Sequence, residues 1–140
     1  MSLRSTIVKV VGGVAVAGGV TWSSQYFTPS EFDSPDAKGS GMMMDSTFIS
    51  MLEDAREIAG VPFRINSGYR TKHRNSLVGG VDGSAHTLGI AADIAVSDSR
   101  QRAIIVQALL DAGFTRIGIA KTFVHCDIDT TKAQNVIWLY

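Results

Sequence analysis

The chain has little cysteine, proline or net charge, and each shortage excludes a class of structure or partner. Its single cysteine, Cys126, excludes an internal disulfide and a zinc site built from several thiolates. Thirteen basic residues balance thirteen acidic ones, so no excess positive charge attracts nucleic acid, and we expect no nucleic-acid partner. With 140 residues, of which 45% are hydrophobic, we expect one globular domain and a short appendage.

The longest hydrophobic run lies near the start of the chain. Residues 7–22 follow Arg4 and are apolar apart from Lys9, Thr21 and four glycines. As a helix they would span about 24 Å, less than the roughly 30 Å of a bilayer core. We interpret residues 1–25 as a signal peptide, with residues 15–17 as its cleavage motif, or as a membrane anchor. A glycine-rich arm docked on a partner is the third possibility, and residues 26–140 form the functional domain.

Capping residues and apolar periodicity predict two main helices. Asp45 or Ser46 caps the first, which ends at Gly60. Asp98 or Ser99 caps the second, which continues through Ala112 with Gly113 at its end. The residues of the first helix expected to share an inward face are Phe48, Met51, Leu52, Ala55 and Ile58.

Short apolar or alternating stretches predict a small sheet. We expect strands at residues 63–66, 90–96, 115–120, 123–129 and 136–140, and a loop over residues 71–83. The predicted fold is therefore α+β, a small antiparallel sheet packed with two main helices.

Candidate metal ligands occur in two separated blocks. Residues 84–94 place His86 seven residues before Asp93, and residues 123–127 read F-V-H-C-D, which adds His125. Imidazole nitrogen and carboxylate oxygen are ordinary zinc ligands. One such pair arises often by chance, but here a third block, N-S-G-Y-R-T at residues 66–71, accompanies both.

Together these blocks resemble the zinc D-alanyl-D-alanine carboxypeptidase family of peptidoglycan peptidases. The resemblance extends from Tyr26 to the end of the chain and rests on S-G-Y-R, V-G-G, S-x-H-x-x-G-x-A-x-D and F-V-H-x-D. The family includes phage endolysins, and its superfamily includes vancomycin-resistance dipeptidases and hedgehog domains. The resemblance implies that the sheet carries a site for one zinc ion, bound by His86, Asp93 and His125.

Three protein ligands leave a fourth zinc position open, which is typical of a catalytic site for amide hydrolysis. Arg70 offers a fixed fork of donors to a substrate carboxylate or a developing oxyanion, so we predict both a catalytic and a substrate-binding role for it. Ser84 either binds substrate or caps the turn before His86. Tyr69 is a further candidate for substrate binding, as a wall of the cleft.

The general base is where this chain departs from the pattern of many members of the family. Many relatives carry Glu or Asp three residues before the last zinc histidine, where this chain has Thr122. Asp127 is the nearest substitute, because residues two apart on a strand share a face and Asp127 thereby joins His125. We predict that Asp127 is the base, and the other possibility is that it steers an imidazole. Cys126 should point to the opposite face, into the core.

The sequence thus predicts a zinc metallopeptidase that cleaves peptidoglycan stem peptides or cross-links at a D-Ala-type bond, in phage lysis or virion entry. A bacterial cell-wall remodelling enzyme is one alternative. A non-catalytic, zinc-stabilised binding module is another, because Thr122 removes the usual carboxylate. We expect a peptidoglycan peptide as partner and a location in the periplasm or on the envelope side of a membrane. Residues 1–25 would provide any association with membrane or virion.

Overall fold

The computed structural model describes residues 15–17 and 20–140, and its centre is a five-stranded sheet. The strands lie in the order β3-β4-β6-β5-β7, and every neighbouring pair is antiparallel except β5 and β7, which run parallel. The prediction of an α+β fold with a small, mostly antiparallel sheet is confirmed. The bounds are β3 Ile65–Ser67, β4 Ala91–Ala95, β5 Arg116–Ile119, β6 Phe123–Asp127 and β7 Val136–Leu139.

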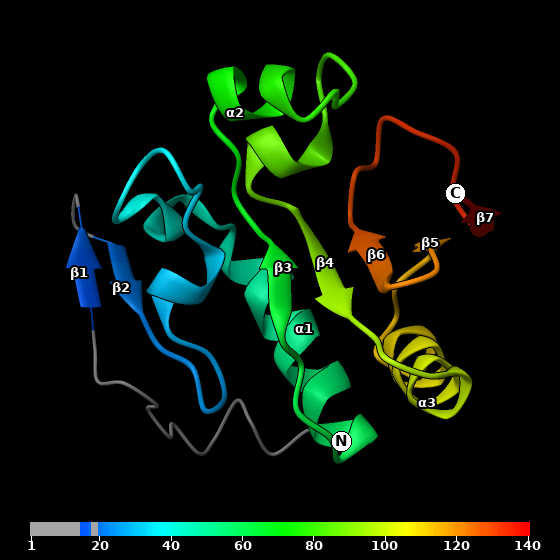
Figure 1. Cartoon of the computed structure of the whole chain (residues 1–140). Coiled ribbons are helices and arrows are strands. Elements are labelled where there is room, and N and C mark those ends of the chain that lie inside the picture. Colours follow the sequence, from blue (N-terminus) through cyan, green and yellow to red (C-terminus); the bar gives the residue numbers. More distant parts are fainter. Residues whose placement is uncertain (1–14, 18–19) are drawn as a thin grey trace.

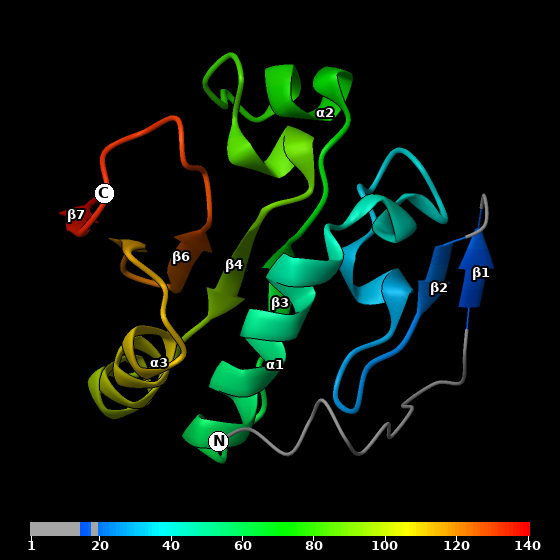
Figure 2. The ribbon, with the colours of Figure 1, turned by 180° about the vertical axis from the view of Figure 1, so that it is seen from behind.

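The two predicted main helices are α1, Ser46–Ala59, and α3, Ser99–Asp111. Helix α1 lies behind β3 and β4 in Figure 1 and in front of them in Figure 2, and α3 packs against α1 and β6. The Asp45 carboxylate accepts a hydrogen bond from the first turn of α1, at Phe48 N, and Asp98 does the same for α3. Gly60 ends α1 in the left-handed conformation, which a glycine adopts without a steric penalty.

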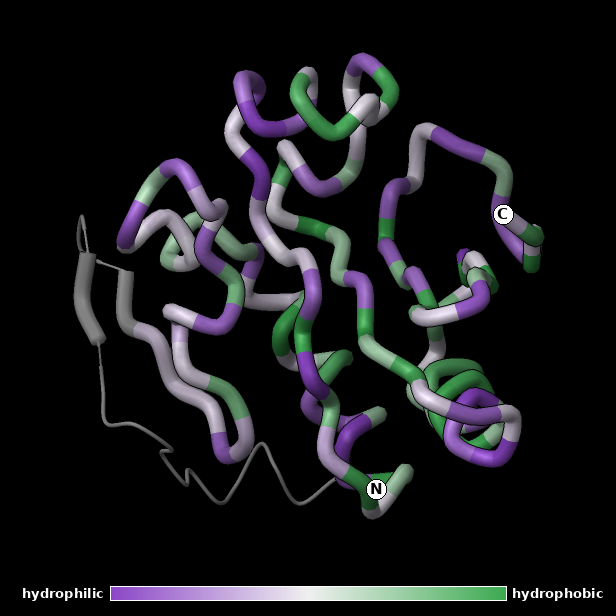
Figure 3. Tube along the Cα trace, in the orientation of Figure 1, coloured by the Kyte–Doolittle hydropathy of each residue, from purple (hydrophilic) through white to green (hydrophobic). Residues whose placement is uncertain are grey.

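The hydrophobic core fills the space between these helices and the sheet. Phe48 of α1 meets Phe114 edge to face, with 5.8 Å between ring centroids. In Figure 3, β4 runs through the middle of the molecule and much of it is coloured as hydrophobic. Ile58, expected to face inward, is instead 51% exposed. The fully buried apolar side chains include Phe27, Phe32, Phe48, Leu52, Ile94, Ile105, Leu109, Ile117 and Val124.

Short helices lie outside the sheet. Residues 71–83, predicted as a loop, contain the helix α2, Lys72–Leu77, which begins because the Thr71 hydroxyl accepts a hydrogen bond from Arg74 N. The described residues also form three 3-10 helices, η1 Pro29–Phe32, η2 Ser40–Met43 and η3 Ala85–Leu88. Both α2 and η3 lie beyond one end of β3 and β4, at the top of Figure 1.

Most of the predicted N-terminal segment, residues 1–25, lies outside the described residues. The described part forms an antiparallel pair, β1 Ala15–Ala17 with β2 Val20–Trp22. The Trp22 side chain is buried in the core, 5.7 Å from the Phe32 ring, and its Nε1 donates to Phe27 O. Trp22 is thus part of the packed core. Among the described residues, no helix is both long and apolar enough to cross a membrane.

Candidate metal centre

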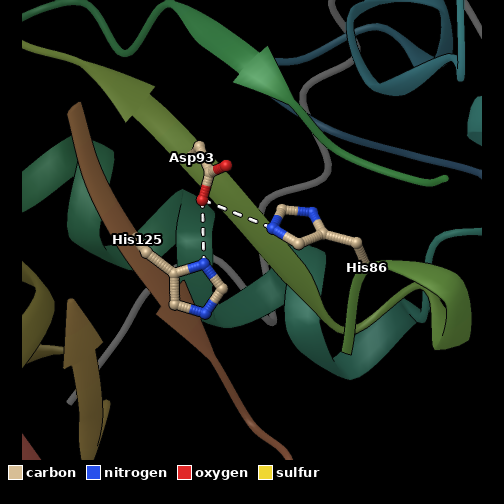
Figure 4. Close-up of side chains that lie close together, drawn as sticks. All are labelled: His86, Asp93 and His125. Atoms are coloured by element: carbon tan, nitrogen blue, oxygen red, sulfur yellow. Dashed lines mark hydrogen bonds and ion pairs between the residues drawn. The ribbon is translucent and has the colours of Figure 1, made fainter. Parts of the chain in front are cut away.

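Three separate elements bring His86, Asp93 and His125 together (Figure 4). Asp93 and His125 are directly paired across β4 and β6, so their side chains leave the sheet on the same face. His86 comes from η3, which ends at Gly89 with φ of 72°. A Cβ at Gly89 would lie 2.3 Å from Met43 O, so only glycine permits this tight turn.

The three side chains are buried and their donor atoms converge. His86 Nε2 lies 3.3 Å from Asp93 Oδ1, and His125 Nδ1 lies 2.8 Å from the same oxygen. One ligand atom from each residue falls within 4.8 Å of the others, so the group could hold a metal ion. Two imidazoles and a carboxylate are a donor set that zinc accepts.

The second nitrogen of each imidazole has its own acceptor. His86 Nδ1 lies 2.8 Å from Gly68 O, and His125 Nε2 lies 2.7 Å from Asp127 Oδ2. Acceptors in these positions fix the tautomer and the ring orientation, as they do for histidines that bind metals. The residues present therefore fit a metal ion held through His86 Nε2, Asp93 and His125 Nδ1.

The same contacts shift the ionisation of the group. Burial alone would raise the pKa of the Asp93 carboxyl, but hydrogen bonds from His125 and His86 outweigh it and hold that pKa well below its usual range. Burial alone would lower the pKa of His125, but hydrogen bonds to Asp127 and Asp93 outweigh it and raise that pKa. Asp93 is thus an anionic ligand at neutral pH, and a metal ion and a proton compete for His125 Nδ1.

Asp127, the predicted general base, is held on both of its oxygens. Its Oδ2 faces His125 Nε2, while its Oδ1 accepts from Arg116 Nε at 2.7 Å and from Asp129 N at 3.0 Å. Burial alone would raise the pKa of Asp127, but the hydrogen bond from His125, with those from Asp129 and Arg116, lowers it. A fully ionised, fully bonded carboxylate suits the steering of an imidazole better than proton transfer.

Arg116 is a buried residue of the site that the sequence reading did not single out. Besides Asp127, its guanidinium donates to Ala133 O at 2.6 Å and lies 4.9 Å from the Trp138 ring centre. The one available signal is a charged residue in an otherwise apolar predicted strand, since a buried arginine almost always has a partner.

Arg70 lies beside the metal centre, held by three contacts. Its Nε donates to Ser67 Oγ, its Nη1 to Asn75 Oδ1, and its Nη2 lies 3.5 Å from Asp93 Oδ2. The first two contacts fix the plane of the guanidinium. A planar group held in this way is ready to bind a carboxylate or an oxyanion with its remaining N–H groups.

The site opens into a cleft of about 540 Å³, which His86, Asp93, His125, Arg70 and Asp127 all line. Ser84 lines it too, although its hydroxyl also accepts from His86 N and so caps η3. Tyr69, by contrast, packs against the core and is not among the described residues that line the cleft. Trp138 and Tyr140 also line the cleft, although the sequence predicted for them only a place in the last strand.

Two further residues bear on the chemistry. Thr122 is exposed in the turn before β6, where its carbonyl accepts from Val96 N. It supplies no carboxylate to the site. Cys126 is fully buried on the opposite face of β6, as predicted, and burial raises the pKa of its thiol well above the usual value. A buried, protonated thiol is a core residue and not a nucleophile.

Comparison with known proteins gives one match that covers most of the chain. The family described as peptidase M15 matches residues 25–127, which include the elements from η1 to β6 and all three candidate ligands. None of the curated proteins matches the chain.

Proposed function

Since the chain belongs to the peptidase M15 family, we propose that it is a zinc-dependent hydrolase of peptidoglycan stem peptides or cross-links, acting at a D-Ala-type bond. The membership is consistent with the resemblance to the zinc D-alanyl-D-alanine carboxypeptidases read from the sequence, and it makes the chain a metallopeptidase. What we propose beyond this membership is the substrate, the bond that is cut and the identity of the metal ion.

The observation that carries the proposal is the position of the His86, Asp93 and His125 group in the cleft. The group is buried, yet it borders a space of about 540 Å³, large enough for several residues of a peptide. A structural zinc site would be closed by a fourth protein ligand. These three residues form a group without such a fourth ligand among the described histidine, cysteine, aspartate and glutamate side chains.

The residues around the group have separable roles in this proposal. A bound zinc ion would supply a Lewis acid that polarises the peptide carbonyl. Arg70 binds the carboxylate end of the substrate or the oxyanion that develops, because Ser67 and Asn75 hold its guanidinium in place. Asp127 holds the His125 ring, and Arg116 holds Asp127. This assigns Asp127 a positioning role in place of the base role predicted from sequence.

The biological setting follows from the substrate. A peptidase that cleaves wall peptides suits phage lysis or virion entry, with bacterial wall remodelling as the alternative. It would act in the periplasm or on the envelope side of a membrane. Residues 1–25 would link it to a membrane or a virion, because they hold the longest hydrophobic run of the sequence.

Digestion of purified peptidoglycan tests this function. The zinc-loaded protein should release peptide fragments whose masses identify the bond that is cut, a chelator should stop the release, and added zinc should restore it. His86→Ala is the matched inactive control. Fragments that persist unchanged in chelator, or no fragments from the zinc-loaded protein, would contradict the proposal.

A second candidate is a non-catalytic module that binds the same peptides. It is favoured by one observation, that the two carboxylates lining the cleft, Asp93 and Asp127, are both held by other side chains among the described residues. This module would bind stem peptides without releasing fragments.

A further inference from the structure

We propose that Trp138 and Tyr140 form the substrate-binding wall of the cleft, and that the Tyr140 ring packs directly against the stem peptide beside the metal centre. The inference rests on the proposed function for its choice of substrate. It concerns residues 136–140, which lie outside the residues 25–127 matched by the peptidase M15 family.

The first argument is the register of the sheet. Trp138 pairs with Gly118 of β5, Gly118 pairs with His125 of β6, and His125 pairs with Asp93 of β4. Side chains in one row across a sheet leave it on the same face. The last strand thus continues the row that holds two metal ligands, and the Trp138 ring lies 5.5 Å from the His125 ring.

The second argument is that β5 leaves space for both aromatic rings. A Cβ at Gly118 would lie 2.7 Å from Trp138 Cε2 and equally close to Tyr140 Cε2. The φ of Gly118 does not demand glycine, because it is not in the left-handed region. The missing side chain at Gly118 therefore serves the seating of the two rings.

The third argument is that Trp138 is enclosed by other side chains whereas Tyr140 is exposed to solvent. Trp138 is held between His125 and the Arg116 guanidinium, so its surroundings are already occupied. Tyr140 contacts the Phe123 ring at 5.2 Å and lines the cleft, yet it is 67% exposed. An aromatic ring that borders a cleft and remains open to solvent offers apolar area for a ligand to cover.

The cleft chemistry indicates which ligand. Val78 and Val81 contribute apolar side chains to the cleft from the loop after α2, while Tyr140 contributes its ring from the far edge of the sheet. Arg70 supplies positive charge to the same space. These features suit a short peptide with small side chains and a carboxylate, which describes a stem peptide that ends in D-Ala.

The test compares Tyr140→Ala with the matched control Leu139→Ala. Leu139 is the neighbouring residue, is 79% exposed, and does not line the cleft. With a synthetic stem pentapeptide ending in D-Ala-D-Ala, Tyr140→Ala should raise KM about tenfold with little change in kcat, as for loss of one well-packed contact. Leu139→Ala should keep both constants. Zinc content and unfolding midpoint, measured on each variant, should match the parent.

Two more variants separate the ring from its setting. Tyr140→Phe keeps the ring and should keep KM, whereas Gly118→Ala displaces both rings and should raise KM. If Tyr140→Ala or Gly118→Ala keeps the parental KM, Trp138 and Tyr140 do not form a substrate-binding wall. If Tyr140→Phe has a KM as high as that of Tyr140→Ala, packing of the ring does not explain the raised KM.

Failure of the proposed wall can be distinguished from failure of the proposed hydrolysis. If the zinc-loaded protein binds the pentapeptide without cleaving it, the Kd from calorimetry replaces KM. A Kd about tenfold higher for Tyr140→Ala than for the parent would then support the binding wall, although the proposed hydrolysis is wrong. If the parent cleaves the pentapeptide and Tyr140→Ala has the same KM, the proposed hydrolysis is supported and the proposed binding wall is wrong. A parent that neither binds nor cleaves the pentapeptide overturns both.

Discussion

Asp127→Asn separates the two roles that the residue could have, because the substitution preserves shape and removes charge. Asp127 is 2% exposed, and three groups of the protein hold its two oxygens, namely His125 Nε2, Arg116 Nε and Asp129 N. Asparagine offers only one acceptor oxygen. The variant leaves both the imidazole and the buried guanidinium without an anionic partner, and its single acceptor oxygen can bond only one of them.

The size of the effect follows from these contacts. Removing one partner of a buried ion pair costs about 3–5 kcal/mol, and we expect the lower end because the amide retains one hydrogen bond. Losing the carboxylate that orients a metal-binding histidine lowers metal affinity by about 10- to 100-fold. Asp127→Asn should therefore lower both the free energy of unfolding and the affinity for zinc.

Two measurements check this, urea unfolding of the metal-free protein and competition for zinc with a chromophoric chelator. The double variant Asp127→Asn with Arg116→Met removes the unpaired charge, so it should regain part of the lost stability while zinc affinity stays low. If Asp127→Asn instead keeps its stability and its zinc while kcat falls by about 10²–10⁴, the residue is the general base and the positioning role is wrong.

The remaining predictions concern Arg70 and the buried Trp22. Arg70→Lys cannot keep the contacts to both Ser67 and Asn75, so kcat/KM should fall by about 10²-fold with zinc content unchanged. The exposed control Arg64→Lys should match the parent. A parental kcat/KM in Arg70→Lys would mean that the guanidinium does not bind the substrate or the oxyanion. Trp22→Ala should lower the free energy of unfolding by about 3–5 kcal/mol in urea titrations, because the indole is buried against Phe32. Exposed Ser23→Ala is its control, and equal stability of the two variants would place Trp22 outside the core.

Local patterns predicted the parts of the fold that depend on local chemistry. Caps at Asp45 and Asp98 and the glycine at Gly60 located both main helices to within a residue or two. Alternation along β6 placed His125 on one face and Cys126 on the other.

What the sequence could not predict depends on long-range pairing. The parallel position of β7 beside β5 brings Trp138 to the cleft, and nothing in residues 136–140 specifies that neighbour. The pairing of Arg116 with Asp127 likewise needs two strands in register. Ile58 is 51% exposed although its spacing fits the buried side of α1. By contrast, α2 depends on a local feature, the side-chain cap at Thr71, within residues that were predicted as a loop.

The central claim is that His86, Asp93 and His125 hold one metal ion, and the metal content of the purified protein tests it most directly. Elemental analysis after dialysis against trace zinc should give one zinc per chain for the parent. Asp93→Asn and His86→Ala, each folded by circular dichroism, should give none, because each loses one of three ligands. A parent without stoichiometric metal, or a His86→Ala variant that retains one zinc per chain, would contradict the account.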